Sequence, residues 1–254
     1  MKKRYKILFY LVILITTFTI LEVKVVKGGE LKRTVYLTFD DGPSSINTEK
    51  VLEILNNNAV KGNFFVVGGN AVKYKEKLEK LREYEMGIYP HCNVHNYKQI
   101  YADENSYFCD LDACNKNLQN ILGEEYNFNF VRLPGGATNE VSNYDIKNNI
   151  LKELNKKGIN YIDWNVDSGD AEAVIVSANK LKNNFKKNCG RYKVEVVLMH
   201  DTDVKDTTVS TLQELINTYK SKGYEFKCLD EITGEEIDYL TNTKVINRKF
   251  IEKK

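Results

Sequence analysis

The sequence predicts an α/β fold in which short parallel strands alternate with helices. Seven short runs rich in β-branched, aromatic and other apolar residues follow Gly29, and most are separated by longer polar stretches with helical spacing. A closed β/α barrel and an open doubly wound sheet both fit this order. Seven strands without a glycine-rich dinucleotide-binding fingerprint favour the barrel. The predicted strands are 35–39, 63–67, 86–89, 128–132, 161–166, 194–199 and 225–229.

The stretches between the strands carry apolar residues at helical intervals. In 208–222, four of them recur at i, i+3, i+4 and i+7 and so share one helix face: Leu212, Leu215, Ile216 and Tyr219. The other predicted helices are 48–58, 71–83, 105–122, 144–157 and 177–187. Because no repeat or linker interrupts the pattern, we expect a single domain over 30–232, followed by a polar, peripheral tail over 233–254.

The composition excludes several classes of protein. Hydrophobic residues make up 42% of the 254 positions and charged residues 28%, values that rule out a disordered or low-complexity chain. Lys and Arg number 37 against 35 Asp and Glu, and the net charge of +2 argues against a nucleic-acid-binding protein. Five cysteines at irregular spacings indicate free thiols rather than a disulfide framework.

The N-terminus has the pattern of an export signal. Four basic residues within the first six positions precede an uncharged apolar run at 7–21, which is typical of a signal peptide and short for a spanning helix. We expect residues 1–29 to be a signal peptide or, if retained, a membrane anchor through 7–21. The protein is then exported to the outer face of the cell membrane, to the cell wall or to the medium.

Chemically active residues follow the carboxyl ends of five predicted strands, where parallel β/α folds place their active sites. All three histidines of the chain are among them. We therefore expect these segments to meet at one rim of the sheet and to form a site. The segments are Asp40-Asp41-Gly42, His91 to His95, Arg132 to Gly136, Asp167 to Asp170, and His200-Asp201.

His91 and His95 predict a metal site. Their i, i+4 spacing puts both imidazoles on one side of a helical turn, and the Asp40-Asp41 pair supplies a carboxylate from a neighbouring strand end. Two histidines and one carboxylate with an open position are the ligand set of a hydrolytic metal site. Successive side chains leave a strand in opposite directions, so one acid can reach the metal while the other faces the reacting water. A solvated Asp-Gly-Pro turn is the alternative.

Arg132 and His200 each allow a functional and a structural interpretation. Arg132 ends a strand, where its guanidinium can hold a carboxylate in bidentate geometry or simply lie at the surface. His200 ends an apolar strand, where a lone histidine is often structural, but its place on the same rim favours a role in the site. Trp164, the only tryptophan, lies within the fifth predicted strand as core or pocket wall.

At these five segments the sequence resembles the polysaccharide deacetylase family, also called carbohydrate esterase family 4 or the NodB-homology domain. The chain's T-F-D-D-G at 38–42, H-C-N-V-H at 91–95 and R-L-P-G-G at 132–136 are similar to three of the family's motifs. Its D-S-G-D at 167–170 and L-M-H at 198–200 resemble two more, in the same order. The resemblance implies a distorted seven-stranded β/α barrel and a metal-dependent N-deacetylase, with 30–232 as the catalytic domain.

The resemblance also implies a role for each site residue. Asp41, His91 and His95 would bind a divalent metal, usually Zn²⁺, with Co²⁺, Ni²⁺ and Mn²⁺ as alternatives. The remaining positions would carry the proton transfers and hold the oxyanion. Asp40 would be the general base, Arg132 would orient Asp40, His200 would be the general acid, Asp170 would tune His200, and the backbone N–H of Gly135 would help bind the oxyanion.

Two positions depart from the family pattern. Cys92 stands where the family has Ser or Thr, and a thiol is a weaker hydrogen-bonding group than the hydroxyl that normally braces this loop. Ala171 stands where the family has Trp, and Trp164 could fill part of that wall from nearby.

The expected function is removal of N-acetyl groups from the amino sugars of a cell-envelope glycan by a monomeric enzyme. Peptidoglycan is the leading substrate because the protein is expected to be exported. The alternatives are another polysaccharide such as a chitin-like oligomer, a small non-sugar amide, and a protein that binds glycan or metal with little or no turnover. A purely structural envelope protein would leave the convergent His and Asp residues unexplained.

Overall fold

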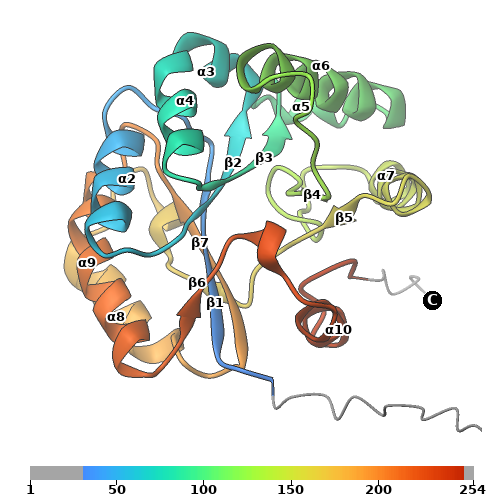
Figure 1. The fold of residues 1–254 in the computed structure, drawn as a ribbon. Helices are drawn as coiled ribbons and strands as arrows, with labels where there is room; N and C mark the ends of the chain where they lie inside the picture. Colours follow the sequence, from blue (N-terminus) through green and yellow to red (C-terminus); the bar gives the residue numbers. More distant parts are fainter. Residues whose placement is uncertain (1–30, 249–254) are drawn as a thin grey trace, which may run out of the picture. The chain divides into compact units, whose positions relative to one another are not determined.

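The computed structural model describes residues 31–248 (Figure 1). The predicted signal peptide or membrane anchor at 1–29 lies outside the described residues and stays a prediction. Within 31–248, no helix combines the length and the apolar character that a membrane span requires.

Five parallel strands form the main path of a sheet in the order β3-β2-β1-β7-β6. The central strand β1 and its neighbour β7 pair along all seven of their residues, and every residue of β1 is buried. Burial of the central strand is expected for a parallel sheet covered by helices. The strands are β1 (Thr34–Asp40), β2 (Asn63–Val67), β3 (Gly87–Cys92), β6 (Val166–Asp167) and β7 (Val194–His200).

Three further strands complete the β-structure of the described residues. β8 (Glu225–Phe226) pairs with the first two residues of β1, and β4 (Phe130–Val131) pairs with β5 (Asn160–Tyr161) in a separate two-stranded sheet. All of these pairings are parallel. The predicted α/β alternation in a single domain is therefore confirmed, whereas closure into a seven-stranded barrel is not shown by the strand pairings within 31–248.

The predicted strand 161–166 is divided into β5 and β6, and the reason lies in one side chain. Asn165 Nδ2 donates to the carbonyl of Val194 at 2.9 Å, and Asn165 Oδ1 accepts from the N–H of Val196 at 2.8 Å. The Asn165 amide therefore occupies backbone groups of β7 that a continuous strand would pair. Trp164 consequently lies between two strands rather than within one.

Helices surround the strands and agree with most of the predicted ranges (Figure 1). The predicted helix 71–83 is instead two helices that meet at Tyr74. The helices are α2 (Asn47–Asn57), α3 (Gly68–Lys73), α4 (Lys75–Glu83), α5 (Tyr97–Ile100), α6 (Glu104–Leu122), α7 (Tyr144–Lys156), α8 (Ala178–Asn188), α9 (Asp206–Ser221) and α10 (Gly234–Asn242).

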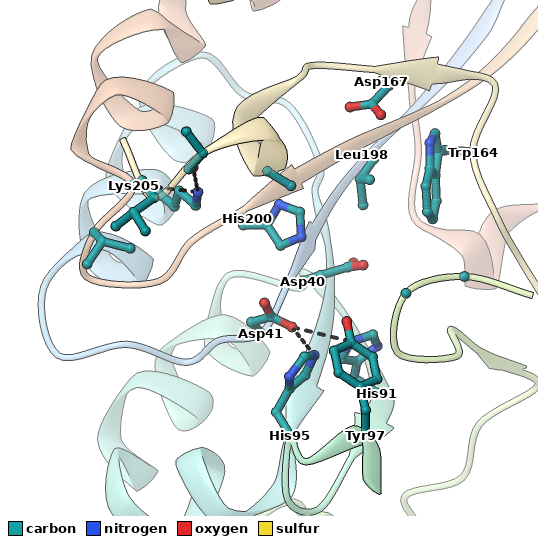
Figure 2. Close-up of a pocket in the computed structure, with 16 residues that line it drawn as sticks. Asp40, Asp41, His91, His95, Tyr97, Trp164, Asp167, Leu198, His200 and Lys205 are labelled. Atoms are coloured by element: carbon teal, nitrogen blue, oxygen red, sulfur yellow. Dashed lines mark hydrogen bonds and ion pairs between the residues drawn. The ribbon is translucent and has the colours of Figure 1, made fainter. Parts of the chain in front are cut away.

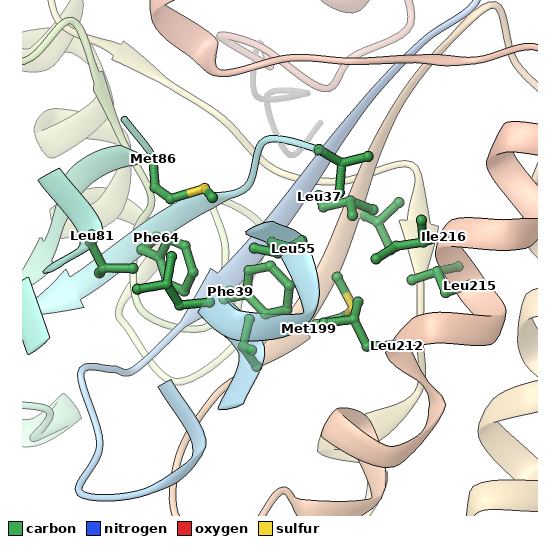
Figure 3. Packing of buried hydrophobic residues seen from close by; sticks show 14 of the residues in the cluster. Leu37, Phe39, Leu55, Phe64, Leu81, Met86, Met199, Leu212, Leu215 and Ile216 are labelled. Carbon is green, nitrogen blue, oxygen red and sulfur yellow. The ribbon is translucent and has the colours of Figure 1, made fainter. Parts of the chain in front are cut away.

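The largest hydrophobic cluster joins the main sheet to helices α2, α4, α8 and α9 (Figure 3). Phe39 of β1 and Phe64 of β2 stack with ring centroids 5.1 Å apart. The predicted apolar face of α9 packs into this cluster through side chains that are fully buried: Leu212, Leu215, Ile216 and Tyr219. This packing holds β1 and β7 in place beneath the site described below.

Over 233–248, the part of the predicted tail that the structure describes, the chain contributes to the domain core, which corrects the expectation of a peripheral segment. Helix α10 begins with a reciprocal capping box between Thr233 and Glu236. Leu240 and Ile246 are fully buried, and Ile246 forms an antiparallel bridge with Ile162. Leu240, Val245 and Ile246 pack into the core, so 233–248 has a structural role despite its polar composition.

We expect Ile246→Ala to lower the free energy of unfolding by about 2–5 kcal/mol, because it leaves a cavity in a packed core. Ile175→Ala is the matched control, since Ile175 is 70% exposed and its truncation should change stability by less than about 0.5 kcal/mol. Urea denaturation of both variants checks this. Equal stability of the two variants would contradict the integral role of the C-terminal segment.

Candidate active site

A cavity of about 510 Å³ opens at the carboxyl ends of the central strands (Figure 2). The β1–β7 register pairs Asp40 with His200, so these two residues stand side by side at the end of the sheet. The cavity gathers most of the residues that the sequence singles out. It is lined by Asp40, Asp41, His91, His95, Tyr97, Gly135, Gly136, Trp164, Asp167, Ala171 and His200, among others.

Asp41, His91 and His95 converge on one point of this cavity (Figure 2). The Nε2 atoms of His91 and His95 lie 3.3 Å and 3.2 Å from Asp41 Oδ1. Asp41 has a φ of 75°, a left-handed conformation that costs energy in a residue with a side chain and that is commonest at functional sites. The carbonyl of Asp41 accepts a hydrogen bond from Asn70 Nδ2 at 3.0 Å, which supports this backbone turn.

The hydrogen bonds around these three residues fit a bound cation. His91 Nδ1–H donates to the carbonyl of Arg132 at 2.8 Å, because a carbonyl can only accept. Because Nδ1 is engaged with this carbonyl, Nε2 is the ring nitrogen that faces Asp41 and can bind a metal, as in metal-ligating histidines. Asp41 Oδ1 is buried and has no hydrogen-bond partner among the described residues. Several electron-pair donors thus face one another, and a divalent metal would satisfy them together.

Electrostatics keep Asp41 ionised. Burial raises the pKa of the Asp41 carboxyl, but His91, His200 and His95 outweigh burial and hold this pKa below its usual range. Burial also lowers the pKa of His95, against the opposing effect of Asp41, which favours the neutral imidazole. An ionised carboxylate is the form of Asp41 that metal binding requires.

Arg132 is fully buried and holds Asp40. Its Nη1 donates to Asp40 Oδ1 at 2.9 Å and to Thr38 Oγ1 at 2.6 Å. The other guanidinium donors bind the carbonyls of Ile162 at 3.0 Å and Asp163 at 3.1 Å. The bidentate geometry considered from the sequence is therefore replaced by contact through a single nitrogen, because backbone carbonyls occupy the remaining donors.

His200 is hydrogen-bonded to Asp170. His200 Nδ1–H donates to Asp170 Oδ1 at 2.8 Å, and Asp170 Oδ2 accepts from the His200 backbone N–H at 2.8 Å and from Thr208 Oγ1 at 2.9 Å. Burial lowers the pKa of His200, but Asp170 and the nearby Asp40 and Asp41 raise it to about 9. His200 is therefore protonated at neutral pH.

Two glycines and Trp164 form another part of the cavity wall. Gly135 and Gly136 have φ values of 77° and 80°, which side chains rarely adopt. A Cβ atom on Gly136 would lie 3.0 Å from the Trp164 ring, so the tryptophan packs directly against this backbone. Trp164 is thus a pocket-wall residue, while Ala171 lines the cavity without an aromatic ring of its own.

Lys205 is a site residue that sequence reasoning missed. Its side chain is largely buried and lines the cavity, and Nζ donates to the carbonyls of Asp170 at 2.7 Å, Ala173 at 3.0 Å and Val174 at 3.2 Å. Lys205 thereby fixes the turn that carries Asp170. The residue follows His200 by five positions in a polar loop, and no motif in the sequence distinguishes it from the exposed lysines of the chain.

A parallel α/β domain with an Asp-His-His cluster, a buried Asp–Arg pair and a His–Asp pair in one cavity has the arrangement typical of metal-dependent hydrolases. The chain belongs to the polysaccharide deacetylase family, whose sequence model matches residues 27–162. The resemblance seen in the motifs is therefore confirmed.

Individual relatives support this assignment over most of the domain. The chain is 32% identical over 204 residues to YheN of Bacillus subtilis, covering 78% of this chain and 68% of YheN. It is 28% identical over 215 residues to a peptidoglycan-N-acetylglucosamine deacetylase of Bacillus cereus, covering 80% of this chain and 72% of the relative.

A solved structure shares the fold. The catalytic domain of peptidoglycan N-acetylglucosamine deacetylase from Eubacterium rectale superimposes with a TM-score of 0.71 at 30% identity, covering 78% of this chain and 88% of that domain.

In chelator-treated protein, we expect His200 to titrate near pH 9 and Asp170→Asn to lower its pKa below that value. The folded-state pKa lies above the ordinary value of 6.5, so the His200–Asp170 pair stabilises the fold fully below about pH 6.5 and this contribution is lost as the pH rises through about 9. NMR titration of the three histidines measures this pKa. A His200 pKa at or below 6.5 would contradict the proposed effect of Asp170 on His200.

Proposed function

We propose that this protein is a hydrolase that removes N-acetyl groups from the amino sugars of a cell-envelope glycan. The observation that carries the proposal is the meeting of Asp41, His91 and His95 with the Arg132-held Asp40 and the Asp170-bound His200 at one cavity. Family membership supports the same chemistry.

Asp41, His91 and His95 would hold a divalent cation, with Zn²⁺ as our first choice for two imidazoles and one carboxylate and Co²⁺, Ni²⁺ or Mn²⁺ as alternatives. When bound, such a metal would polarise the acetyl carbonyl and lower the pKa of a water molecule toward neutrality. Asp40 takes a proton from the attacking water. Arg132 fixes the direction of the Asp40 carboxylate through the 2.9 Å hydrogen bond and leaves the other oxygen of Asp40 for this task.

His200 supplies the second proton transfer. Its Nδ1–H is engaged by Asp170, so Nε2–H is the donor that reaches into the cavity toward the departing amine nitrogen. A positioned acid or base of this kind contributes about 10²–10⁴-fold in rate. The backbone N–H of Gly135 would donate to the developing oxyanion, and loss of one such donor commonly costs about 10²–10³-fold.

Peptidoglycan is the substrate that we propose. Two of the relatives described above carry peptidoglycan N-acetylglucosamine deacetylase in their names, and the apolar run at 7–21 is consistent with export of the enzyme to the cell envelope. Deacetylation would leave free amines and therefore positive charge on the wall. The alternative sugars are N-acetylmuramic acid and the units of a chitin-like polymer.

A second candidate function is binding of glycan or metal with little turnover. Ala171 favours it, because this wall of the cavity has no aromatic side chain at that position and is completed by Ala173, Val174 and Val204. The acetate assay described next separates the two functions.

We expect the protein to release acetate from N-acetylated glycans, to lose this activity on exhaustive chelation and to recover it when Zn²⁺ or Co²⁺ is restored. Asp40→Asn should reduce the rate by at least about 10²-fold, because it removes the base and leaves Asp41, His91 and His95 intact. Acetate quantification measures this. Full activity after chelation, or in Asp40→Asn, would contradict the proposed chemistry, and metal binding without acetate release would favour the second function.

We expect defined muropeptides to lose one acetyl group on N-acetylglucosamine when incubated with the metal-loaded protein. Mass spectrometry locates the missing acetyl group, and chitooligosaccharides and N-acetylmuramic acid units in the same assay test the alternative sugars. Cell walls treated with the protein should also resist muramidase digestion relative to walls treated with Asp40→Asn. Equal digestion of the two wall samples would count against peptidoglycan.

A further inference from the structure

The backbone between the two histidines is held by a buried carboxylate on another element. Asp110 lies on helix α6 and is 7% exposed. Its Oδ2 accepts a hydrogen bond from the N–H of Asn93 at 2.7 Å, and its Oδ1 accepts from the N–H of Val94 at 3.1 Å. Both N–H groups belong to the bend that leads from His91 to His95. The two bonds are charge-assisted and are therefore among the stronger hydrogen bonds of the domain.

Two further hydrogen bonds hold the same bend at Asn93. Asn117, also on α6, donates its Nδ2–H to Asn93 Oδ1 at 2.9 Å. The N–H of Gly69 on α3 donates to the carbonyl of Asn93 at 3.0 Å. The N–H, carbonyl and side chain of Asn93 are thus all bound, so the course of the chain toward His95 is set by α3 and α6.

Cys92 contributes no comparable restraint. Its side chain is 2% exposed and belongs to a hydrophobic cluster with Val67, Tyr107 and Leu111. Cys92 therefore packs in the core, and the hydrogen bonds that hold the bend come from Asp110 and Asn117.

The two histidines also differ in how they are fixed. His91 lies on β3, is buried, and donates Nδ1–H to the Arg132 carbonyl. The side chain of His95 is 31% exposed and lies beyond the end of the strand, with its ring 5.2 Å from that of Tyr97. Its position relative to Asp41 depends on the bend at Asn93 and Val94.

We propose that Asp110 is a positioning residue that organises the metal site by holding the His91–His95 bend, so that His95 Nε2 stays aimed at Asp41. This inference rests on the metal site of the proposed function and extends it to a residue on α6. Asp110 lies 15 positions beyond His95, and its side chain binds backbone N–H groups of the bend.

Titration of the chelator-treated full chain with Co²⁺, followed by the visible absorption of the bound ion, tests this inference. Asp110→Asn keeps the size of the side chain but turns an amide N–H toward one of the two backbone donors. We expect its Co²⁺ affinity to fall by about 10- to 100-fold, as is typical when a partner of the metal ligands is removed, with an altered absorption spectrum.

Glu195→Gln is the matched control. Glu195 is also a buried carboxylate, and it accepts from the N–H groups of Gly190, Arg191 and Tyr192, but it lies near the start of β7, at the opposite end of that strand from His200. Both variants should lower Tm, because each weakens bonds to backbone N–H groups. Only Asp110→Asn should weaken Co²⁺ binding, so a general loss of stability cannot mimic the result.

Asn117→Ala is a milder variant that keeps the inference testable if Asp110→Asn does not fold. It removes one contact to Asn93 and should weaken Co²⁺ binding severalfold. If the unmodified chain binds no Co²⁺, both the proposed metal site and this inference fail. If the unmodified chain binds Co²⁺ and the folded bend variants bind it equally well, or if Glu195→Gln weakens binding as much as they do, this inference alone is overturned.

Discussion

A buried guanidinium is the constraint on which the site depends. Arg132 is buried away from water. Because a buried, unpaired charge is very unfavourable, its N–H donors need acceptors within the protein. Asp40 and Thr38 supply acceptors from the main sheet, and the carbonyls of Ile162 and Asp163 supply them beside the two-stranded sheet. The Arg132 carbonyl in turn orients His91. One residue thereby joins the two sheets, aims the proposed base and sets the tautomer of a metal-ligand candidate.

The charges around the cavity are coupled to one another. The carboxylates of Asp40, Asp41 and Asp170 face two cationic side chains, Arg132 and His200, and this excess of negative charge helps to raise the pKa of His200. A divalent cation beside Asp41 would offset part of that charge and lower the pKa of His200. Metal loading and proton donation are therefore linked, and the metal would bring the acid closer to the pH at which it can both give and regain its proton.

Much of the fold and of the site could be predicted from the sequence, because both rest on local patterns. Alternating strands and helices, and polar residues at strand ends, are visible without tertiary information. Non-local contacts explain what was missed. The Asn165 amide divides a strand by binding a distant segment, Ile246 is a core residue within a polar stretch, and Lys205 and Asp110 act through backbone groups that no spacing rule connects to them. Closure of the strands into a barrel also depends on such contacts.

The residue-for-residue pairing of β1 with β7 limits how such a protein can diversify. Asp40 and His200 occupy one rung of a continuous ladder, so a slip of one residue would turn one of them to the opposite face of the sheet. The floor of the cavity is therefore resistant to gradual change. The side chains of Ala171 and Val174 line the cavity, whereas Lys205 holds their segment through backbone carbonyls, so these side chains can change without loss of that restraint. New glycan preferences can arise there while the reaction centre is inherited intact.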